Sequence, residues 1–202
     1  MFEPPPHTLL RIGTQCAFAD APDWVERALR RAPWVVVRRS LPRGGRIPVG
    51  VRGGSRGQRF AAWLARDEIL EQVQPPQLVP VAPGRRALAA IQALDAAGRI
   101  LAGHGLQGDW GPAGSVGFEL ASGCESATAD SDLDLILTLR QLPPVAQARR
   151  LCQALGCLPV RADVLLELPQ GAVALAEFSR SPGSFVLRTA TGPRLVTADS
   201  PH

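Results

Sequence analysis

The segment SDLDLILTLR at residues 131–140 constrains the fold more than any other part of this sequence. Successive side chains of a β-strand point to opposite faces of the sheet. Read as a strand, the segment carries aspartates Asp132 and Asp134 on one face, roughly 6–7 Å apart. That face also holds Ile136, Thr138 and Arg140, and the other face consists of Leu133, Leu135, Leu137 and Leu139. One face can therefore join a core while the other presents two carboxylates.

Two carboxylates this close repel each other, which raises a pKa unless a cation lies between them. Mg²⁺ suits the position, because it takes one or two protein carboxylates and shares its remaining sites with water and substrate phosphates. A polar edge on an ordinary half-buried strand is the alternative interpretation. A Gly114-Ser115 pair upstream, behind Trp110-Gly-Pro, favours the functional interpretation.

A second segment, residues 160–168, repeats the pattern of a core face and an acid face. Its acid face carries Arg161, Asp163, Leu165 and Glu167. If the two strands pair side by side, Asp163 lies next to Asp132 and Asp134. The alternative for Asp163 is a salt bridge with a neighbouring arginine.

The basic residues are all arginine and are distributed unevenly. Residues 1–100 carry 15 Arg against 8 acidic residues (+7), and residues 101–202 carry 7 against 10 (−3), which gives the net charge of +4. Genomic base composition accounts for part of the preference for arginine. One stretch without any acid holds Arg38, Arg39, Arg43, Arg46, Arg52, Arg56 and Arg59. Such a stretch suits a polyphosphate or an acidic protein partner; nucleic acid and a solvated positive surface are the alternatives.

No apolar run approaches the ~20 residues of a membrane helix. The N-terminal MFEPPPHTLL lacks the basic and apolar regions of a secretory signal. The four cysteines form no CxxC pair, which indicates thiols in a reducing compartment. We therefore expect a cytoplasmic protein that does not bind a membrane.

Residues 74–85, QPPQLVPVAPGR, have the composition of a semi-rigid linker. We predict an α+β fold with two domains, a small Arg-rich α+β domain at residues 1–78 and a second domain at residues 79–202. In the first domain we expect a helix from Asp20 to Pro33, then strands at 34–37 and 47–52 and a helix at 58–73. In the second we expect helices at 86–102 and 143–155, strands at 116–121, 131–140, 160–168, 172–178 and 185–189, and a polar tail from Thr191.

Two further features receive no functional role. GHGLQG at residues 103–108 matches the letters of a dinucleotide-binding motif, but it follows a predicted helix instead of a strand, so we interpret it as a helix end and loop. His7 lies beside apolar residues, where a lone histidine is usually packed or solvated.

A Gly-Ser pair, an Asp-x-Asp strand and a third acid on a later strand resemble the nucleotidyltransferase superfold. A narrower resemblance covers His7 to about Pro193. The segments WGPAGSVGFELASG, DSDLDLIL and RADVLLE, and APWVVVRR, IPVGVRG and QRFAAWL nearer the N-terminus, are similar to the phosphoribosyl-dephospho-CoA transferases of malonate decarboxylase. These enzymes are also called malonate decarboxylase holo-acyl-carrier-protein synthases.

The resemblance implies a nucleotidyltransferase-like second domain with a mixed sheet and helices. It implies that Asp132, Asp134 and Asp163 are catalytic and bind Mg²⁺. It also implies that the substrate is bound by Gly114 and Ser115. From the basic stretch we expect Arg52, Arg56 and Arg59 to bind the substrate as well. Gly114 and Ser115 would hold the terminal phosphates.

The implied reaction transfers phosphoribosyl-dephospho-CoA from 2'-(5''-triphosphoribosyl)-3'-dephospho-CoA to a serine of the apo acyl-carrier subunit of malonate decarboxylase and releases diphosphate. On this interpretation nucleic acid is not a partner. Two alternatives stay open. One is another Mg²⁺-dependent nucleotidyltransferase that acts on RNA or a small molecule, and the other is a non-catalytic assembly module for the decarboxylase.

Overall fold

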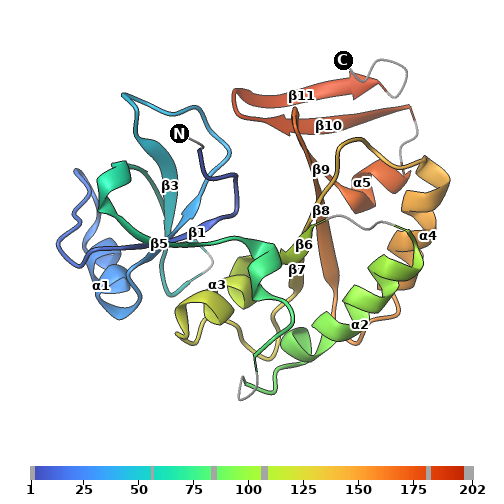
Figure 1. Ribbon diagram of the computed structural model, residues 1–202, viewed down its shortest axis with the longest axis horizontal. Coiled ribbons are helices and arrows are strands. Elements are labelled where there is room, and N and C mark those ends of the chain that lie inside the picture. The colour runs from blue at the N-terminus through green and yellow to red at the C-terminus, as the bar shows by residue number, and fades with distance from the viewer. Residues whose placement is uncertain (1–2, 56, 83–85, 106–108, 181–182, 198–202) are drawn as a thin grey trace.

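Two β-sheets, each with its own helices, organise the chain in the α+β arrangement predicted from the sequence (Figure 1). The computed structural model describes residues 3–55, 57–82, 86–105, 109–180 and 183–197. The part that carries the first sheet is called the first domain below, and the part that carries the second sheet is called the second domain. Within the described residues, no helix is both long and apolar enough to cross a membrane.

The first sheet contains five antiparallel strands in the order β4-β3-β2-β1-β5. Its strands are β1 (Leu9–Ile12), β2 (Trp34–Val37), β3 (Ile47–Arg52), β4 (Arg59–Leu64) and β5 (Ile69–Val73). Helix α1 (Asp23–Arg31) buries Val25 and Leu29 and ends before Pro33, as predicted. The predicted strands at 34–37 and 47–52 are also confirmed.

The helix predicted over residues 58–73 is wrong. β4 pairs with β3, β5 pairs with β1, and a short 3-10 turn, η1 (Arg66–Glu68), joins them. The apolar spacing and the helix-forming Ala, Glu and Gln residues of this segment fit a helix locally. Pairing with strands distant in the sequence overrides that preference. The Glu68 carboxylate accepts a hydrogen bond from the Ala65 N–H at 2.9 Å and stabilises the turn.

The second sheet has six strands in the order β11-β10-β9-β8-β7-β6. They are β6 (Trp110–Pro112), β7 (Leu133–Thr138), β8 (Ala162–Leu168), β9 (Gly171–Ala174), β10 (Ser184–Thr189) and β11 (Gly192–Thr197). β7 and β8 are parallel, and the other neighbours are antiparallel. The helices are α2 (Ala89–Gly103), α3 (Gly114–Ser122), α4 (Val145–Leu155) and α5 (Leu175–Arg180).

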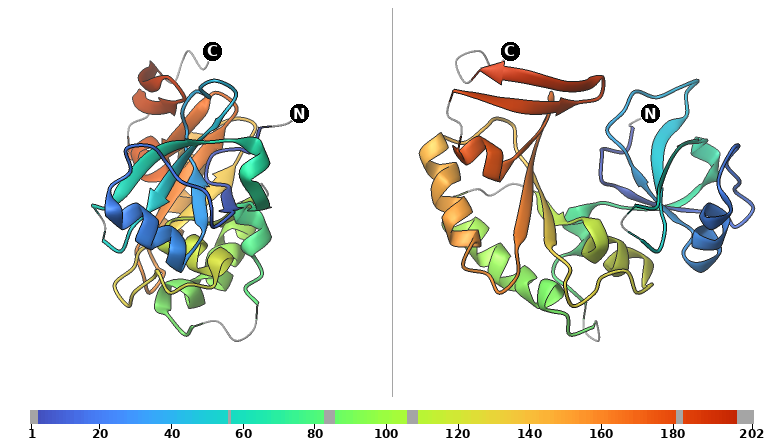
Figure 2. Two further views of the ribbon diagram at one scale, coloured as in Figure 1. Left: turned by 90° about the vertical axis from the view of Figure 1, so that its left-hand side faces the viewer. Right: turned by 180° about the vertical axis from the view of Figure 1, so that it is seen from behind.

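Helices α2 and α4 cover the side of the second sheet that faces away from the first domain (Figures 1 and 2). The leucine face of β7 is buried there, with Leu133, Leu135 and Leu137 at most 1% exposed. The opposite side of the sheet is turned towards the first domain (Figure 2). The alternation predicted for residues 131–140 therefore directs the aspartates to the space between the domains.

Three predictions for the second domain need correction. Residues 116–121 belong to helix α3 and not to a strand. The strand predicted at 172–178 ends at Ala174, after which the chain forms α5. The tail from Thr191 contributes β11, which pairs with β10 along its length. Of the GHGLQG segment, residues 106–108 lie outside the described part of the chain; Gly103 ends α2, as predicted for a helix end.

The two domains are packed together. Leu9 and Trp34 of the first domain belong to the same buried hydrophobic cluster as the core of the second. Arg39 forms an ion pair with Glu167 of β8 across the interface. A second 3-10 turn, η2 (Pro75–Leu78), connects the domains and packs against β6. At this contact a Cβ added to Gly111 would lie 1.9 Å from the Pro75 carbonyl oxygen, so only glycine fits.

The atoms that an added Cβ at Gly111 would meet belong to the backbone of Pro75 and Pro76, which cannot move aside as a side chain can. The substitution Gly111→Ala should therefore lower the free energy of unfolding by about 2–3 kcal/mol. The matched control is Gly103→Ala, where an added Cβ has nothing within 4 Å, and its stability should be unchanged or slightly higher. Urea denaturation of both variants followed by circular dichroism measures the difference. Equal stability of the two variants would contradict the contact.

Candidate active site

The parallel pairing of β7 with β8 brings two acids together. In the observed register Asp134 is the partner of Asp163, with Leu133 opposite Ala162 on one side and Leu135 opposite Val164 on the other. Neighbouring strands lie about 4.8 Å apart, so the two aspartates occupy adjacent positions. The predicted side-by-side pairing is therefore confirmed. Asp132 directly precedes β7, which is shorter than the predicted strand.

Gly114 lies directly against Asp134. Strand β6 runs antiparallel to β7 and delivers the chain to this point, where the Ala113 N–H donates a hydrogen bond of 2.8 Å to the Asp134 carbonyl oxygen. Gly114 has a φ of +57°, and an added Cβ would lie 1.8 Å from Asp134 Oδ2. Glycine at this position therefore leaves room for the Asp134 carboxylate.

Helix α3 begins at Gly114, so the Gly-Ser pair forms its first turn. The first N–H groups of a helix have no partner inside the helix and are available to a ligand. Ser115 is only 8% exposed, and its hydroxyl donates a 3.3 Å hydrogen bond to Ser131 Oγ. Ser131 Oγ in turn accepts a bond from the Thr128 N–H at 2.9 Å. Ser115 thus connects α3 to the loop that leads into β7.

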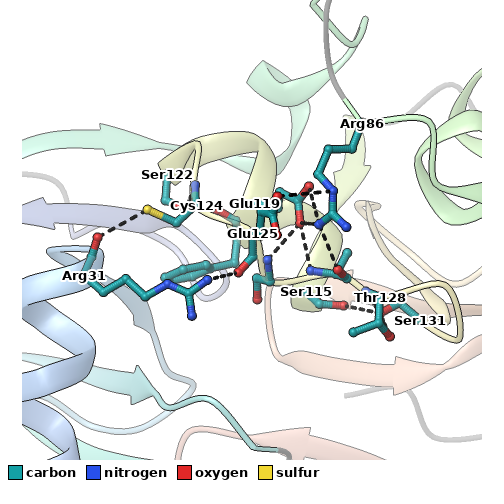
Figure 3. Close-up of polar contacts among 12 residues, drawn as sticks. Arg31, Arg86, Ser115, Glu119, Ser122, Cys124, Glu125, Thr128 and Ser131 are labelled. Carbon is teal, nitrogen blue, oxygen red and sulfur yellow. Dashed lines mark hydrogen bonds and ion pairs between the residues drawn. The ribbon is translucent and has the colours of Figure 1, made fainter.

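Glu119 holds the same loop from the other end of α3. Its buried carboxylate accepts hydrogen bonds from the Ser126 and Ala127 N–H groups at 2.8 and 2.9 Å and contacts Arg86 at 3.3 Å (Figure 3). The sequence analysis placed residues 116–121 in a strand and assigned Glu119 no role. The carboxylate fixes the path of the chain before Asp132.

Two cavities meet at Asp134. The first, of about 880 Å³, is lined by Asp134 and Asp163 and is called the Asp163 cavity below. The second, of about 800 Å³, is lined by Asp132, Asp134 and Ser115 and is called the Ser115 cavity. Gly114 lines the first cavity. All five predicted residues of the second domain therefore line one or both of these cavities.

The first domain contributes arginines to both cavities. Arg52 of β3 and Arg59 of β4 are partners in the strand register, and both line the two cavities. The third predicted residue, Arg56, lies outside the described residues. Other members of the predicted arginine stretch have different roles: Arg39 pairs with Glu167, and the Arg43 guanidinium lies 5.6 Å from the centre of the Trp63 ring.

Three arginines of the second domain also line the Asp163 cavity. Arg161 directly precedes β8 and lies on the acid face predicted for residues 160–168. The sequence analysis did not single out the other two, Arg180 of α5 and Arg188 of β10, because no local cluster in the sequence signals them. Their positions become visible only once the sheet order is known.

Burial raises the pKa of Asp134, and the neighbouring Asp163 and Asp132 carboxylates raise it further. Arg52 and Arg59 act in the opposite direction. The Asp163 carboxylate accepts a 3.2 Å hydrogen bond from Arg161, which is the salt bridge considered as an alternative. Because both side chains of that pair are well exposed, at 72% and 42%, the pair contributes little stability and Asp163 can exchange this partner for a ligand.

The donor set suits a cation that brings part of its own coordination shell. In the described part of the chain, no three His, Cys, Asp or Glu side chains form a ready-made metal-binding group. Mg²⁺ needs only one or two carboxylates if water and substrate phosphates complete its shell. Adjacent Asp134 and Asp163, whose mutual repulsion a cation would relieve, meet that requirement.

His7 occupies the wall of the Asp163 cavity in an unusual backbone conformation, with a φ of 69°. Burial and the nearby Arg39 and Arg188 lower its pKa from 6.5 to about 4. The imidazole is therefore neutral at pH 7, and its 3.9 Å contact with Glu167 is not an ion pair there. Non-glycine residues with positive φ are frequent at functional sites. No local pattern around His7 indicates this placement.

The fold and the site together define a two-domain α+β protein whose acid pair, glycine contact and arginines suit the binding of a phosphorylated substrate. Two family models match the chain. "Phosphoribosyl-dephospho-CoA transferase MdcG N-terminal domain" matches residues 5–76, and "Phosphoribosyl-dephospho-CoA transferase MdcG C-terminal domain" matches residues 77–199. The chain belongs to the phosphoribosyl-dephospho-CoA transferase family, and it is an enzyme of the transferase class.

Similar curated proteins extend over almost the whole chain. A phosphoribosyl-dephospho-CoA transferase of Pseudomonas putida (strain GB-1) is 42% identical over 97% of this chain and 95% of its own length. A protein of the same name from Azotobacter vinelandii is 41% identical over 96% of this chain and 92% of its own. No solved structure matches the chain significantly.

The substitution Gly114→Ala should reduce transferase activity at least ~100-fold, because the new Cβ displaces the Asp134 carboxylate. Gly123→Ala is the matched control: Gly123 ends the same helix with a φ of 72°, and an added Cβ there has nothing within 4 Å. Both variants should lose about 1–2 kcal/mol of stability from the left-handed conformation. Similar activity in both variants would show that the contact between Gly114 and Asp134 is unimportant.

The low pKa of His7 predicts a pH-dependent loss of stability. The unfolded chain takes up a proton near pH 6.5 and the folded chain only near pH 4, so the contribution of neutral His7 is complete above pH 6.5 and is lost as the pH falls towards 4. Between pH 7.5 and 5, wild type should lose about 2 kcal/mol from this source. His7→Asn should lose correspondingly less, because the asparagine side chain does not titrate in this range. Asparagine also tolerates the positive φ at this position.

Free energies of unfolding measured in urea at the two pH values test this prediction. His104→Asn, at a histidine outside the linings of both cavities, is the control and should lose as much as wild type. A loss in His7→Asn as large as in wild type would exclude His7 as the source.

Proposed function

We propose that this enzyme transfers phosphoribosyl-dephospho-CoA from 2'-(5''-triphosphoribosyl)-3'-dephospho-CoA to a serine of the apo acyl-carrier subunit of malonate decarboxylase, with release of diphosphate. The names of its full-length relatives support the transferred group. The observation that carries the proposal is the position of Asp134, packed against Gly114, beside Asp163 and between two arginine-lined cavities.

In this reaction the serine hydroxyl attacks the phosphorus next to the ribose. A phosphodiester bond forms, the bond to diphosphate breaks, and the serine proton must be accepted. Asp134 and Asp163, with Asp132 beside them, would hold Mg²⁺. When bound, the ion supplies positive charge at the attacked phosphate and the leaving diphosphate. Asp163 is the more accessible of the adjacent acids, and we assign to it the acceptance of the serine proton.

The first turn of α3 and the arginines of the first domain would fix the triphosphate. Helix N-termini favour anions through unpaired N–H groups and the helix dipole. Gly114 and Ser115 provide such groups at the junction of the two cavities. Arg52 and Arg59 approach the same junction from the other domain and can bind phosphate oxygens bidentately. The leaving group is then held from both sides.

Release of diphosphate with the purified apo carrier subunit tests this function. Asp134→Asn should reduce the rate at least ~100-fold, because it removes charge where the developing negative charge must be balanced. Asp95→Asn is the control, since Asp95 is an exposed acid of α2 outside both cavity linings. Removing Mg²⁺ with a chelator should stop wild type as well.

The same assay distinguishes other activities. Equal rates for Asp134→Asn and Asp95→Asn would overturn the catalytic role of Asp134. If labelled ATP or CTP is incorporated into RNA or a small molecule without the carrier subunit, the enzyme is a different nucleotidyltransferase.

A further inference from the structure

The two cavities that meet at Asp134 have different walls. The Asp163 cavity has apolar walls from both domains, with Leu9 and Val36 from the first and Val164 and Leu165 from the second, none of which lines the other cavity. The Ser115 cavity shares Phe118 with it and is otherwise bordered mainly by small and polar residues, among them Gly53, Gly54, Ser55, Thr128 and Ser131. A ligand whose reacting phosphate lies at Asp134 can extend into both, and its apolar part fits only the first.

The arginines of the Asp163 cavity differ in position. Arg52 and Arg59 lie at the junction with the Ser115 cavity, and Arg161 pairs with Asp163. Arg180 and Arg188 are exposed residues that line the Asp163 cavity alone. Arg188 lies on β10, three strands from Asp134 on β7, which corresponds to roughly 14 Å across the sheet.

Arg188 is displaced along the strands as well. It is the register partner of Ala172, which is the partner of Glu167, four residues or roughly 13 Å along β8 from Asp163. The backbone of Arg188 is thus on the order of 20 Å from the acid pair. At that separation Arg188 serves a different anionic group from the one at Asp134. Arg180 of α5 lines the same cavity, and its Nε donates a 2.8 Å hydrogen bond to the Ala176 carbonyl oxygen.

We propose that the Asp163 cavity binds the dephospho-CoA part of the donor, with Arg180 and Arg188 on its 5'-diphosphate, while the Ser115 cavity binds the triphosphate. This inference rests on the proposed function. Two ribose rings separate the reacting phosphate of that donor from its 5'-diphosphate. Such a ligand needs two cationic positions with an apolar wall between them for the adenine and the pantetheine arm.

Binding to the full-length enzyme, without turnover, tests the assignment. Isothermal titration calorimetry in the presence of Mg²⁺ measures the affinity for two probes. Dephospho-CoA represents the arm of the donor, and inorganic tripolyphosphate represents its reactive end. The variants are the double substitution Arg180→Ala/Arg188→Ala and the control Arg194→Ala, an exposed arginine of β11 outside both cavity linings. Melting temperatures confirm that the variants are folded.

The double substitution should weaken dephospho-CoA binding at least ~10-fold, as expected for the loss of charge-assisted hydrogen bonds. Tripolyphosphate binding should change less than ~2-fold, and Arg194→Ala should match wild type with both probes. Saturating tripolyphosphate should leave dephospho-CoA able to bind, because the two probes occupy different cavities.

Unchanged dephospho-CoA affinity in the double variant would overturn the arm assignment and leave the proposed function standing. If that variant instead shows only a raised KM for the carrier subunit, the two arginines dock the protein acceptor, and the assignment is also overturned. If wild type binds no dephospho-CoA at all, both the assignment and the proposed donor are wrong.

Discussion

The in-register pairing of parallel strands β7 and β8 sets the position of the groups in the site. It brings the carboxylates of Asp134 and Asp163 next to each other at the edge of a cavity. Burial and mutual repulsion make this arrangement costly, as the raised pKa of Asp134 shows. The leucine face of β7, fixed in the core, prevents the strand from turning its acids away. A cation and a polyphosphate would relieve the repulsion that the core imposes.

The remaining structure supports that arrangement from three directions. Helix α3 presents a glycine at a point where the Asp134 carboxylate leaves no room for a side chain. The buried Glu119 ties down the loop that enters β7. The first domain brings Arg52 and Arg59 opposite the acids, and the ion pair between Arg39 and Glu167 helps to hold the domains together. The enzyme's cleft is therefore a product of both domains.

Alternation and motif spacing predicted the acid strands and their side-by-side pairing. They failed where a segment fits two structures locally. Residues 58–73 have the apolar spacing of a helix, but pairing with distant strands makes them β-structure. Phe118 and Leu120 alternate with Glu119 as in a strand, but the buried contacts of Glu119 are made from a helix. Positions that depend on sheet order, such as His7 beside Glu167 and Arg188 three strands from Asp134, leave no local trace. A resemblance to a known family supplied the reaction, which spacing alone cannot.

The location of a bound cation decides whether the acid pair works as described. A crystal structure of the enzyme with Mn²⁺ in place of Mg²⁺ and with tripolyphosphate, recorded at a wavelength where manganese scatters anomalously, gives that location directly. We expect an anomalous peak between the carboxylates of Asp134 and Asp163, in contact with a phosphate oxygen. A fully occupied tripolyphosphate with no peak between these two carboxylates would contradict the metal-assisted mechanism.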